Sequence, residues 1–197
     1  MSKRLFDWIL SSLGLLVLGP VLILVALAIK LDSPGPVFFR QERVGRWGHP
    51  FWIHKFRTMR HDPVGQGLQI TVGQDARITR VGGLLRGSKL DELPQLIDVW
   101  VGTMSLVGPR PEVPRYVAVY PPELRDKILS VRPGITDIAS IEYRDESAVL
   151  ARAADPEQAY LHEVLPHKLA LSARYVDQAS VWTDLQLILR TLLAIVR

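Results

Sequence analysis

The sequence of 197 residues contains no cysteine, which excludes disulfide bonds, thiolate nucleophiles and cysteine zinc sites. Its five histidines show no HExxH motif or other metal-binding spacing. No glycine pattern matches a Walker A loop or a dinucleotide-binding fingerprint, so ATP hydrolysis and hydride transfer are disfavoured. A metal in this protein would need oxygen ligands, and Mg²⁺ is therefore the cofactor that we expect.

Charge of one sign is only in slight excess. The 24 Lys and Arg residues against 20 Asp and Glu residues give a net charge of +4 at pH 7. This mild basic excess suits phosphate-bearing ligands or an anionic membrane surface, and we expect no nucleic-acid partner. The length is sufficient for one domain with a sizeable core.

The sequence contains only one long apolar run. Trp8 to Ile29 carries no charge over 22 residues. As a helix it would be about 33 Å long, enough to span a hydrocarbon core, and it is too long for a cleaved signal peptide. Basic residues lie on both sides of it, and Gly19-Pro20 falls near its middle. A kinked single-pass anchor and a helix that bends at Gly19-Pro20 and returns to the same face both fit this pattern.

The segment 33–197 is predicted to form one compact, loop-rich α+β domain after the membrane segment 1–32. Residue types predict two strands joined by a Gly-containing loop, at Val37–Gln41 and Phe51–Phe56. Residues 60–77 and 108–114 are predicted to be loops. Apolar periodicity predicts helices at Ile78–Leu85, Asp91–Val101, Glu123–Leu129, Pro156–Leu165, Lys168–Tyr175 and Val181–Val196. The last helix is apolar over more than one face, so it would close the core or lie in the membrane interface.

Two adjacent carboxylates, Asp91 and Glu92, stand before Pro94 in SKLDELPQLIDVW. Apolar residues from Leu93 onward fall on one helical face, and proline is tolerated in the first helical turn, so the helix is predicted to begin at about Asp91. Asp91 would then be the N-cap, and Glu92 would lie where the helix dipole favours anions. The pair is either a capping feature or a catalytic one.

Basic residues accumulate around this pair in segments that are rich in Gly and Pro. The planar fork of arginine matches phosphate oxygens, and a stiff loop lowers the cost of ordering it. Each residue alone could be a solvated surface cation, but their concentration favours an anion-binding site. They are Lys55, Arg57, Arg86, Lys89, Arg110 and Arg132.

Three segments in this order resemble the bacterial sugar transferases, which are monotopic phosphoglycosyl transferases that begin lipid-linked glycan assembly. The first segment runs from Lys3 to Met59. The second is LDELPQLIDVWVGTMSLVGPRPE at 90–112, and the third is RPGIT at 132–136. The resemblance covers essentially the whole chain.

The resemblance implies a re-entrant helix, broken at Gly19-Pro20, in the bacterial inner membrane. A cytosolic α/β catalytic domain with interfacial amphipathic helices would follow on the cytoplasmic face. The implied reaction transfers a sugar 1-phosphate from a UDP-sugar to polyprenyl (undecaprenyl) phosphate and releases UMP, with Mg²⁺ as cofactor. Membrane lipids, a second copy of the chain and later glycosyltransferases are the other partners that we expect.

The resemblance also assigns roles to residues of this sequence. Asp91 resembles the nucleophile that forms a covalent aspartyl intermediate, Glu92 resembles its catalytic partner, and both are candidate Mg²⁺ ligands. The basic residues named above become candidate substrate ligands, together with Pro109, Glu112, Tyr143 and Arg144. A carboxylate nucleophile is chemically reasonable, because it divides a difficult displacement between two anions into two steps.

The sequence departs from the commoner family pattern at two positions. Asp137 stands where a glycine is commoner, and Asp98 stands where an asparagine is more usual. The carboxylate pair is intact, so these changes concern sugar selectivity, which we expect within Ile135–Arg144. Two other hypotheses are a membrane-anchored, non-catalytic adaptor of a glycan pathway and a nucleotide-sugar or lipid phosphate hydrolase.

Overall fold

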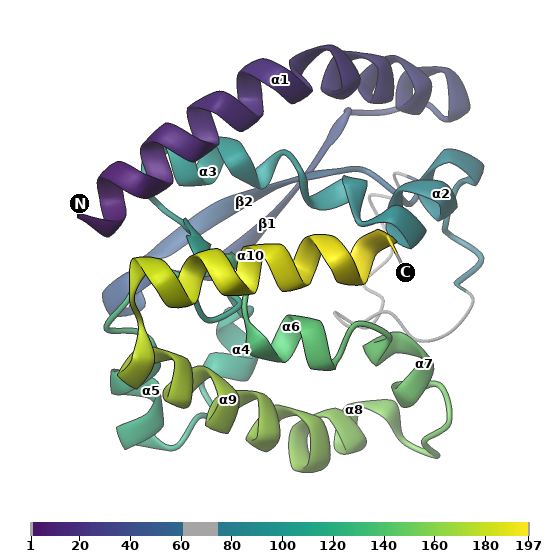
Figure 1. Ribbon diagram of the computed structural model, residues 1–197. Helices are drawn as coiled ribbons and strands as arrows, with labels where there is room; N and C mark the ends of the chain where they lie inside the picture. The colour runs from purple at the N-terminus through teal and green to yellow at the C-terminus, as the bar shows by residue number, and fades with distance from the viewer. Residues whose placement is uncertain (1, 61–74, 197) are drawn as a thin grey trace.

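The computed structural model describes residues 2–60 and 75–196, and Figure 1 shows how they are arranged. Helix α1 (Lys3–Asp32) lies along one side of the molecule and helix α9 (Leu165–Gln178) along the other, with helix α10 (Val181–Val196) between them. The mixture of helices with small sheets confirms the predicted class. Most of the loop predicted at 60–77 lies outside the described residues.

Helix α1 is continuous through Gly19 and Pro20, so the predicted break in the helix is not present. Pro20 has no N–H to donate to the preceding turn, and Figure 1 shows α1 changing direction along its length. Among the described residues, α1 is the one helix long and apolar enough to cross a membrane. Many of its large apolar side chains are exposed, including Leu16 and Leu24.

Charged groups join the first turns of α1 to the rest of the domain. Asp7 is buried and accepts hydrogen bonds from Ser105 Oγ and Leu106 N, both at 3.1 Å. Lys3 pairs with the carboxylate of Asp184 in α10, and Asp184 is fully buried. The amino end of α1 is therefore fixed against two segments that lie far along the chain.

The carboxyl end of α1 is held by Arg57. The guanidinium Nη2 donates to the carbonyl oxygen of Ser33 at 2.8 Å, and only 4% of the residue is exposed. Nearby, Ile29 of α1 packs against Phe56 and Leu85 in a small buried cluster. Both ends of the long helix thus have specific partners in the domain.

The two predicted strands are confirmed. Strand β1 (Phe38–Val44) pairs with strand β2 (Pro50–Phe56) in an antiparallel hairpin, with Phe38 opposite Phe56. β1 continues to Val44, beyond the predicted end at Gln41, because the pairing persists up to the turn at Arg46–Gly48. The hairpin places Lys55 at its carboxyl end, beside the segment that carries the carboxylate pair.

The helix predicted to begin at Asp91 begins later. Helix α2 (Arg80–Ser88) ends at Lys89, whose left-handed backbone (φ 58°, ψ 15°) turns the chain. Leu90–Glu92 then form a separate 3₁₀ turn, and helix α3 (Gln95–Val101) starts after the proline. The prediction that Asp91 caps α3 is therefore wrong. The carboxylate pair lies on a short turn between two helices.

A second pair of strands was not predicted. Strand β3 (Ser105–Val107) and strand β4 (Gly134–Thr136) are parallel. Their backbones approach so closely that a Cβ atom on Gly134 would lie 2.1 Å from Gly108 N. Glycine is therefore required where the GPRPE segment crosses the RPGIT segment, and the crossing brings these two motifs together.

The remaining helices pack beneath the sheets around the largest buried cluster, which includes Val113, Tyr116 and Leu165. The segment predicted as one helix at Pro156–Leu165 is divided into α8, a π-helical turn at Tyr160–Val164 and the start of α9. Val181–Val196 is confirmed as α10. The shorter helices are α4 (Pro114–Val117), α5 (Pro122–Ile128), α6 (Ile138–Glu142), α7 (Glu146–Leu150) and α8 (Pro156–Ala159).

Candidate active site

A cavity of about 960 Å³ contains most of the predicted site residues, and a volume of this size is typical of small-molecule sites. Part of its lining is apolar and comes from α1 and α10, with Leu10, Gly14, Leu18, Ile188 and Leu192. Another part is charged, with Lys55, Arg86, Lys89, Asp91, Glu92 and Arg110. The cavity is therefore amphiphilic, and the long apolar helix contributes directly to its lining.

Glu92 binds two of the predicted cations. Lys55 Nζ donates to Glu92 Oε1 at 2.9 Å, and Arg110 Nη1 donates to Glu92 Oε2 at 3.1 Å, while Arg110 Nη2 donates to Oε1. Burial opposes ionisation of this carboxyl, but Arg110 and Lys55 together hold the pKa of Glu92 well below its usual range. Glu92 is therefore an ionised group that fixes the positions of two cations.

Asp91 differs from its neighbour. The residue lines the cavity, but its Oδ1 atom is buried and has no hydrogen-bond partner among the described residues. Burial, and then the adjacent charge of Glu92, raise the pKa of Asp91, while Lys55 and Arg86 oppose this shift. Two neighbouring carboxyls thus have pKa values displaced in opposite directions, an arrangement that is common at catalytic sites.

Other predicted ligands lie in the same cavity and are anchored to its lining. Arg86 and Tyr143 are both part of it. Lys89 Nζ donates to the carbonyl oxygen of Arg144 at 3.3 Å, and the Arg144 guanidinium donates to the carbonyl oxygen of Ala194 in α10. These contacts link the turn that carries Asp91 to the carboxyl end of α10.

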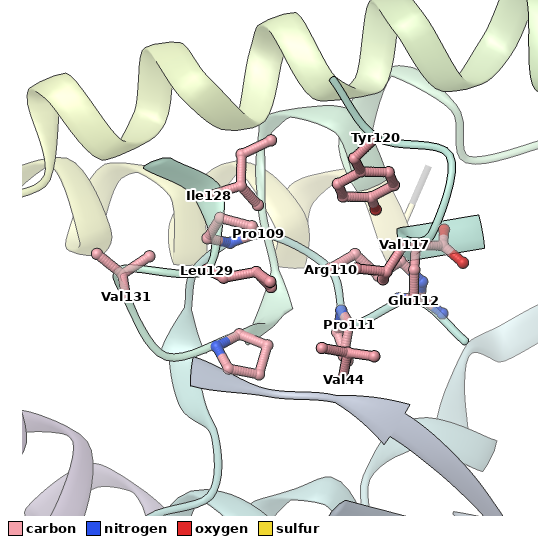
Figure 2. Close-up of a pocket in the computed structure, with 11 residues that line it drawn as sticks. Val44, Pro109, Arg110, Pro111, Glu112, Val117, Tyr120, Ile128, Leu129 and Val131 are labelled. Atoms are coloured by element: carbon pink, nitrogen blue, oxygen red, sulfur yellow. The ribbon is translucent and has the colours of Figure 1, made fainter. Parts of the chain in front are cut away.

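The GPRPE loop supports the site through its prolines. Pro109 and Pro111 line a separate pocket of about 10 Å³, whose volume is close to that of a single water probe, and neither lines the large cavity. Figure 2 shows Pro109 and Pro111 among the surrounding side chains, including Val44 and Leu129. The sequence analysis predicted Pro109 to be a substrate ligand. In the structure it packs beneath the loop, in the small pocket.

Two further candidate ligands are not brought to the cavity. Arg57 donates to carbonyl oxygens at the end of α1, and Arg132 Nε donates to the carbonyl oxygen of Gly102 at 2.8 Å, just after α3. Neither lines the large cavity. Both guanidinium groups bind carbonyl oxygens at helix ends, which stabilises the fold.

The two departures from the family pattern have local structural partners. Asp137 is buried and caps α6 by accepting a hydrogen bond from Ser140 N at 2.7 Å. Asp98 accepts a hydrogen bond from His54 N at 2.9 Å, and its other oxygen lies 2.7 Å from His54 Nδ1. Both carboxylates therefore hold elements together. Neither lines the cavity, whereas most of the other residues in Ile135–Arg144 do.

Polar residues that the sequence analysis missed also line the cavity, and they include Arg43, Tyr116, Tyr160 and Lys168. Lys168 Nζ lies 2.9 Å from Glu146 Oε2 and 3.5 Å from Glu112 Oε1, and it is almost completely buried. The sequence pattern could have identified Lys168, because this residue is on the same helical face as the buried residues Leu165 and Leu169. A lysine at such a position needs a partner.

The lining of the cavity offers Mg²⁺ few oxygen ligands. No group of three His, Asp or Glu residues gathers among the described residues. The carboxylate of Asp91, which has an unpartnered Oδ1, is a suitable ligand for a hard cation, whereas both oxygens of Glu92 are occupied by Lys55 and Arg110. Mg²⁺ in phosphate-handling sites is often held by one or two carboxylates and substrate phosphates, and Asp91 fits that pattern.

Comparisons with known proteins show which proteins the chain is similar to. The chain is 37% identical over 199 residues to the UDP-glucose:undecaprenyl-phosphate glucose-1-phosphate transferase of Xanthomonas campestris, covering 96% of this chain and 38% of the relative. It is 37% identical to the protein of the same name from Caulobacter vibrioides, covering 97% and 68%. It is 34% identical to the UDP-N-acetylgalactosamine-undecaprenyl-phosphate N-acetylgalactosaminephosphotransferase of Aeromonas hydrophila, covering 96% and 42%.

The family model described as bacterial sugar transferase matches residues 1–197, and the chain belongs to this family. The resemblance inferred from the three sequence segments is thereby confirmed. The chain spans about two fifths of the length of the Xanthomonas and Aeromonas relatives. The names of these relatives include different sugars, so family membership alone does not identify the donor sugar.

Proposed function

We propose that this protein is a phosphoglycosyl transferase that moves a sugar 1-phosphate from a UDP-sugar to undecaprenyl phosphate. The observation that carries this proposal is the amphiphilic cavity, in which Asp91 and Arg110 share a lining with Leu10 and Leu18 of α1. A nucleotide sugar needs the cations, and a polyprenyl chain needs the apolar helix. The named activities of the relatives support the same reaction.

Asp91 is the proposed nucleophile. Its Oδ1 atom forms a bond to the phosphorus that carries the sugar, and the bond from that phosphorus to the UMP oxygen breaks. The resulting aspartyl–phosphate–sugar is then attacked by an oxygen of undecaprenyl phosphate, which releases Asp91 as a carboxylate. The buried, unpartnered Oδ1 supports this role, because an atom held without a hydrogen bond loses none when it attacks.

Glu92 is proposed to position Lys55 and Arg110 for the phosphates. Its low pKa makes it a poor proton acceptor, so we favour a positioning role over a proton-transfer role. Lys55 and Arg110 would neutralise the charge that develops on the leaving phosphate. Mg²⁺, held by the diphosphate and by the oxygen of Asp91 that does not attack, would supply further charge neutralisation. Arg110→Lys keeps the charge without the fork, so donor use should weaken substantially.

The membrane arrangement is also a proposal. We infer that α1 enters and leaves the cytoplasmic face of the bacterial inner membrane, with its bend at Pro20 setting the depth. The exposed face of α10, which includes Trp182, Leu189 and Leu193, would lie in the interface beside it. A polyprenyl tail could then reach the cavity without leaving the membrane. Homodimer formation and contact with later glycosyltransferases stay predictions.

One assay tests the reaction and separates it from the alternatives. Purified protein with Mg²⁺ and a panel of UDP-sugars should release UMP over many turnovers only when undecaprenyl phosphate is present, and at most one UMP per enzyme molecule without it. UMP or sugar phosphate formed equally well without lipid would favour a hydrolase, and no product with any donor would favour the adaptor. The Asp91→Asn protein is the control, and its activity should fall on the order of 10³-fold or more.

A second measurement tests the covalent step. The enzyme is mixed with donor in the absence of lipid, and its peptides are examined by mass spectrometry. A sugar-phosphate adduct should be found on the peptide that contains Asp91. An adduct on another peptide would refute the assignment of the nucleophile, even if the overall reaction is correct.

A further inference from the structure

A second charged cluster lines the cavity in addition to the Glu92 cluster. Glu112 Oε1 accepts a hydrogen bond from Tyr160 OH at 2.6 Å and lies 3.5 Å from Lys168 Nζ. Glu112 Oε2 lies 3.7 Å from Arg43 Nη1, and Lys168 also pairs with Glu146. The mechanism proposed above uses none of these groups.

Two donors in this part of the lining are buried and unused. Tyr116 is 2% exposed, and its hydroxyl has no hydrogen-bond partner among the described residues. Arg43 Nε likewise lacks a partner there, although other nitrogens of the same guanidinium bind Pro111 O and Gln41 Oε1. Burial raises the pKa of Tyr116, so its hydroxyl stays protonated and can donate. A buried polar group without a partner is destabilising unless something supplies that partner.

The chemistry of this cluster indicates the class of ligand. Arg43 and Lys168 balance Glu112 and Glu146, so the four side chains carry no net charge. A phosphate would gain little attraction there, and a polyprenyl chain would leave the donors unsatisfied. An uncharged group with many hydroxyls suits a mixture of carboxylate, hydroxyl and guanidinium groups. The hexose part of a nucleotide sugar has this character.

The position of the cluster along the chain agrees with that ligand. Glu112 is two residues after Arg110 on the same proline-stiffened loop, and both line the large cavity. Arg110 is the proposed ligand of the diphosphate. The sugar is bonded directly to the phosphate that Asp91 would attack, so it must lie next to this loop.

We propose that Tyr116, Arg43 and the Glu112–Tyr160–Lys168 network form a sugar-recognition wall that determines which UDP-sugar is used. This inference rests on the proposed transferase function. Tyr116 OH and Arg43 Nε donate to sugar hydroxyl or acetamido oxygens, and the network orients Glu112 to accept from a sugar hydroxyl. Sites that hydrogen-bond a substrate group discriminate strongly against analogues that lack it.

The test compares Tyr116→Phe with the wild type on a panel of UDP-sugars. For the preferred donor, kcat/KM should fall on the order of 10-fold to 100-fold, and for a poor donor it should change less than about threefold. The preference among sugars therefore collapses. The thermal midpoint should not fall, because the deleted hydroxyl has no partner in the free enzyme.

Tyr120→Phe is the matched control. Tyr120 is also a buried tyrosine beside α4, but it lines the small pocket of Figure 2 and not the large cavity. The Tyr120→Phe variant should have the same preference among UDP-sugars as the wild type. Arg43→Lys is a second test variant that keeps the charge opposite Glu112 and removes Nε, and it should shift the preference in the same direction as Tyr116→Phe.

Three outcomes would overturn the proposal. An equal loss for every UDP-sugar would place Tyr116 at the nucleotide, which all donors share. Unchanged kinetics in both Tyr116→Phe and Arg43→Lys would remove the wall from the site. A fall in the thermal midpoint, with unchanged sugar preference, would show a packing role only.

A binding measurement keeps this inference separate from the transferase proposal. Thermal shifts of the wild type are recorded with glucose 1-phosphate, N-acetylgalactosamine 1-phosphate and UMP. The sugar phosphates should give unequal shifts that become equal in Tyr116→Phe, while the UMP shift is unchanged. This result supports the wall even if no UDP-sugar is turned over. Equal sugar phosphate shifts in the wild type, or a UMP shift lost in the variant, would refute it.

Discussion

Replacing the two adjacent carboxylates singly should change stability in opposite directions. Glu92 and Lys55 have only 16% and 17% of their side-chain surface exposed, and Arg110 has 30%. Glu92→Gln therefore leaves two largely shielded cations without their counter-charge. Removing one partner of a buried ion pair typically costs about 3–5 kcal/mol. For a chain of this size, where 1 kcal/mol is equivalent to roughly 2–4 °C, the thermal midpoint should fall by about 6–20 °C.

Asp91→Asn should have the opposite effect. Oδ1 of Asp91 is buried without a partner among the described residues, and burial disfavours its charge. An uncharged side chain of the same shape removes the charge that burial and the neighbouring Glu92 disfavour. The midpoint should therefore rise by a few degrees while activity is lost. Such a gain is typical of residues kept for function at the expense of stability.

The pH dependence gives the sign of each contribution independently. The pKa of Glu92 is lowered by folding, so its stabilising contribution is present above its usual pKa of 4.5 and is lost as the pH falls through the lower folded value. The pKa of Asp91 is raised by folding, so its destabilising contribution is complete above that raised value and absent below the usual 3.8. Both variants should approach the wild type in stability at acidic pH.

Thermal unfolding followed by the fluorescence of the five tryptophans, in detergent micelles from about pH 2 to pH 8, measures both effects. Glu92→Asp and Asp91→Glu are controls that keep the negative charge and change the length of the side chain. If both carboxylate-to-amide variants lower the midpoint by similar amounts at pH 7, the contrast between a paired and an unpaired carboxylate is refuted.

Three further predictions concern the framework of the site. Gly134→Ala should destabilise the fold by more than about 1–3 kcal/mol, because its Cβ would meet backbone atoms of Gly108. Gly19→Ala is the control, because no atom lies within 4 Å of its added Cβ. Equal thermal midpoints for the two variants would contradict the close contact between Gly134 and Gly108. Asp184→Asn should cost about 1.5–3 kcal/mol, because the buried side chain loses its charged contact with the partly exposed Lys3, and a midpoint equal to that of the wild type would refute this. Single cysteines at positions 2 and 33 should react only from the cytoplasmic side of intact spheroplasts, and labelling of position 2 from outside would mean that α1 spans the membrane.

Local patterns were sufficient to predict the framework elements. The bounds of α10 coincide with the apolar stretch Val181–Val196, and the hairpin follows the aromatic and β-branched residues of β1 and β2. Strands β3 and β4 escaped prediction because each has only three residues and they pair across a long separation in sequence. What fixes that pairing is the contact between two glycines, and a contact of that kind has no local signature.

Only part of the candidate site could be predicted from the sequence, because the rest depends on contacts between distant segments. Lys55 and Arg110 were expected beside Glu92, and the structure brings them there. Arg57 had the same motif context, yet it binds the carbonyl oxygens at the end of α1. Sequence proximity to a motif does not distinguish a cation that binds substrate from one that caps a helix. That distinction depends on where α1 ends in space.

In the GPRPE loop, the prolines that stiffen the segment alternate with the charged residues that line the large cavity. In an extended segment, residues two apart lie on the same face. All four residues 109–112 line the small pocket, but only Arg110 and Glu112 also line the large cavity. The prolines stiffen the segment against Val44, so the two charged groups need little further ordering when a substrate binds. In the proposed function, one face of a single loop would present a cation to the phosphates and a carboxylate to the sugar. Any change that rotates the loop would therefore disturb catalysis and sugar choice together.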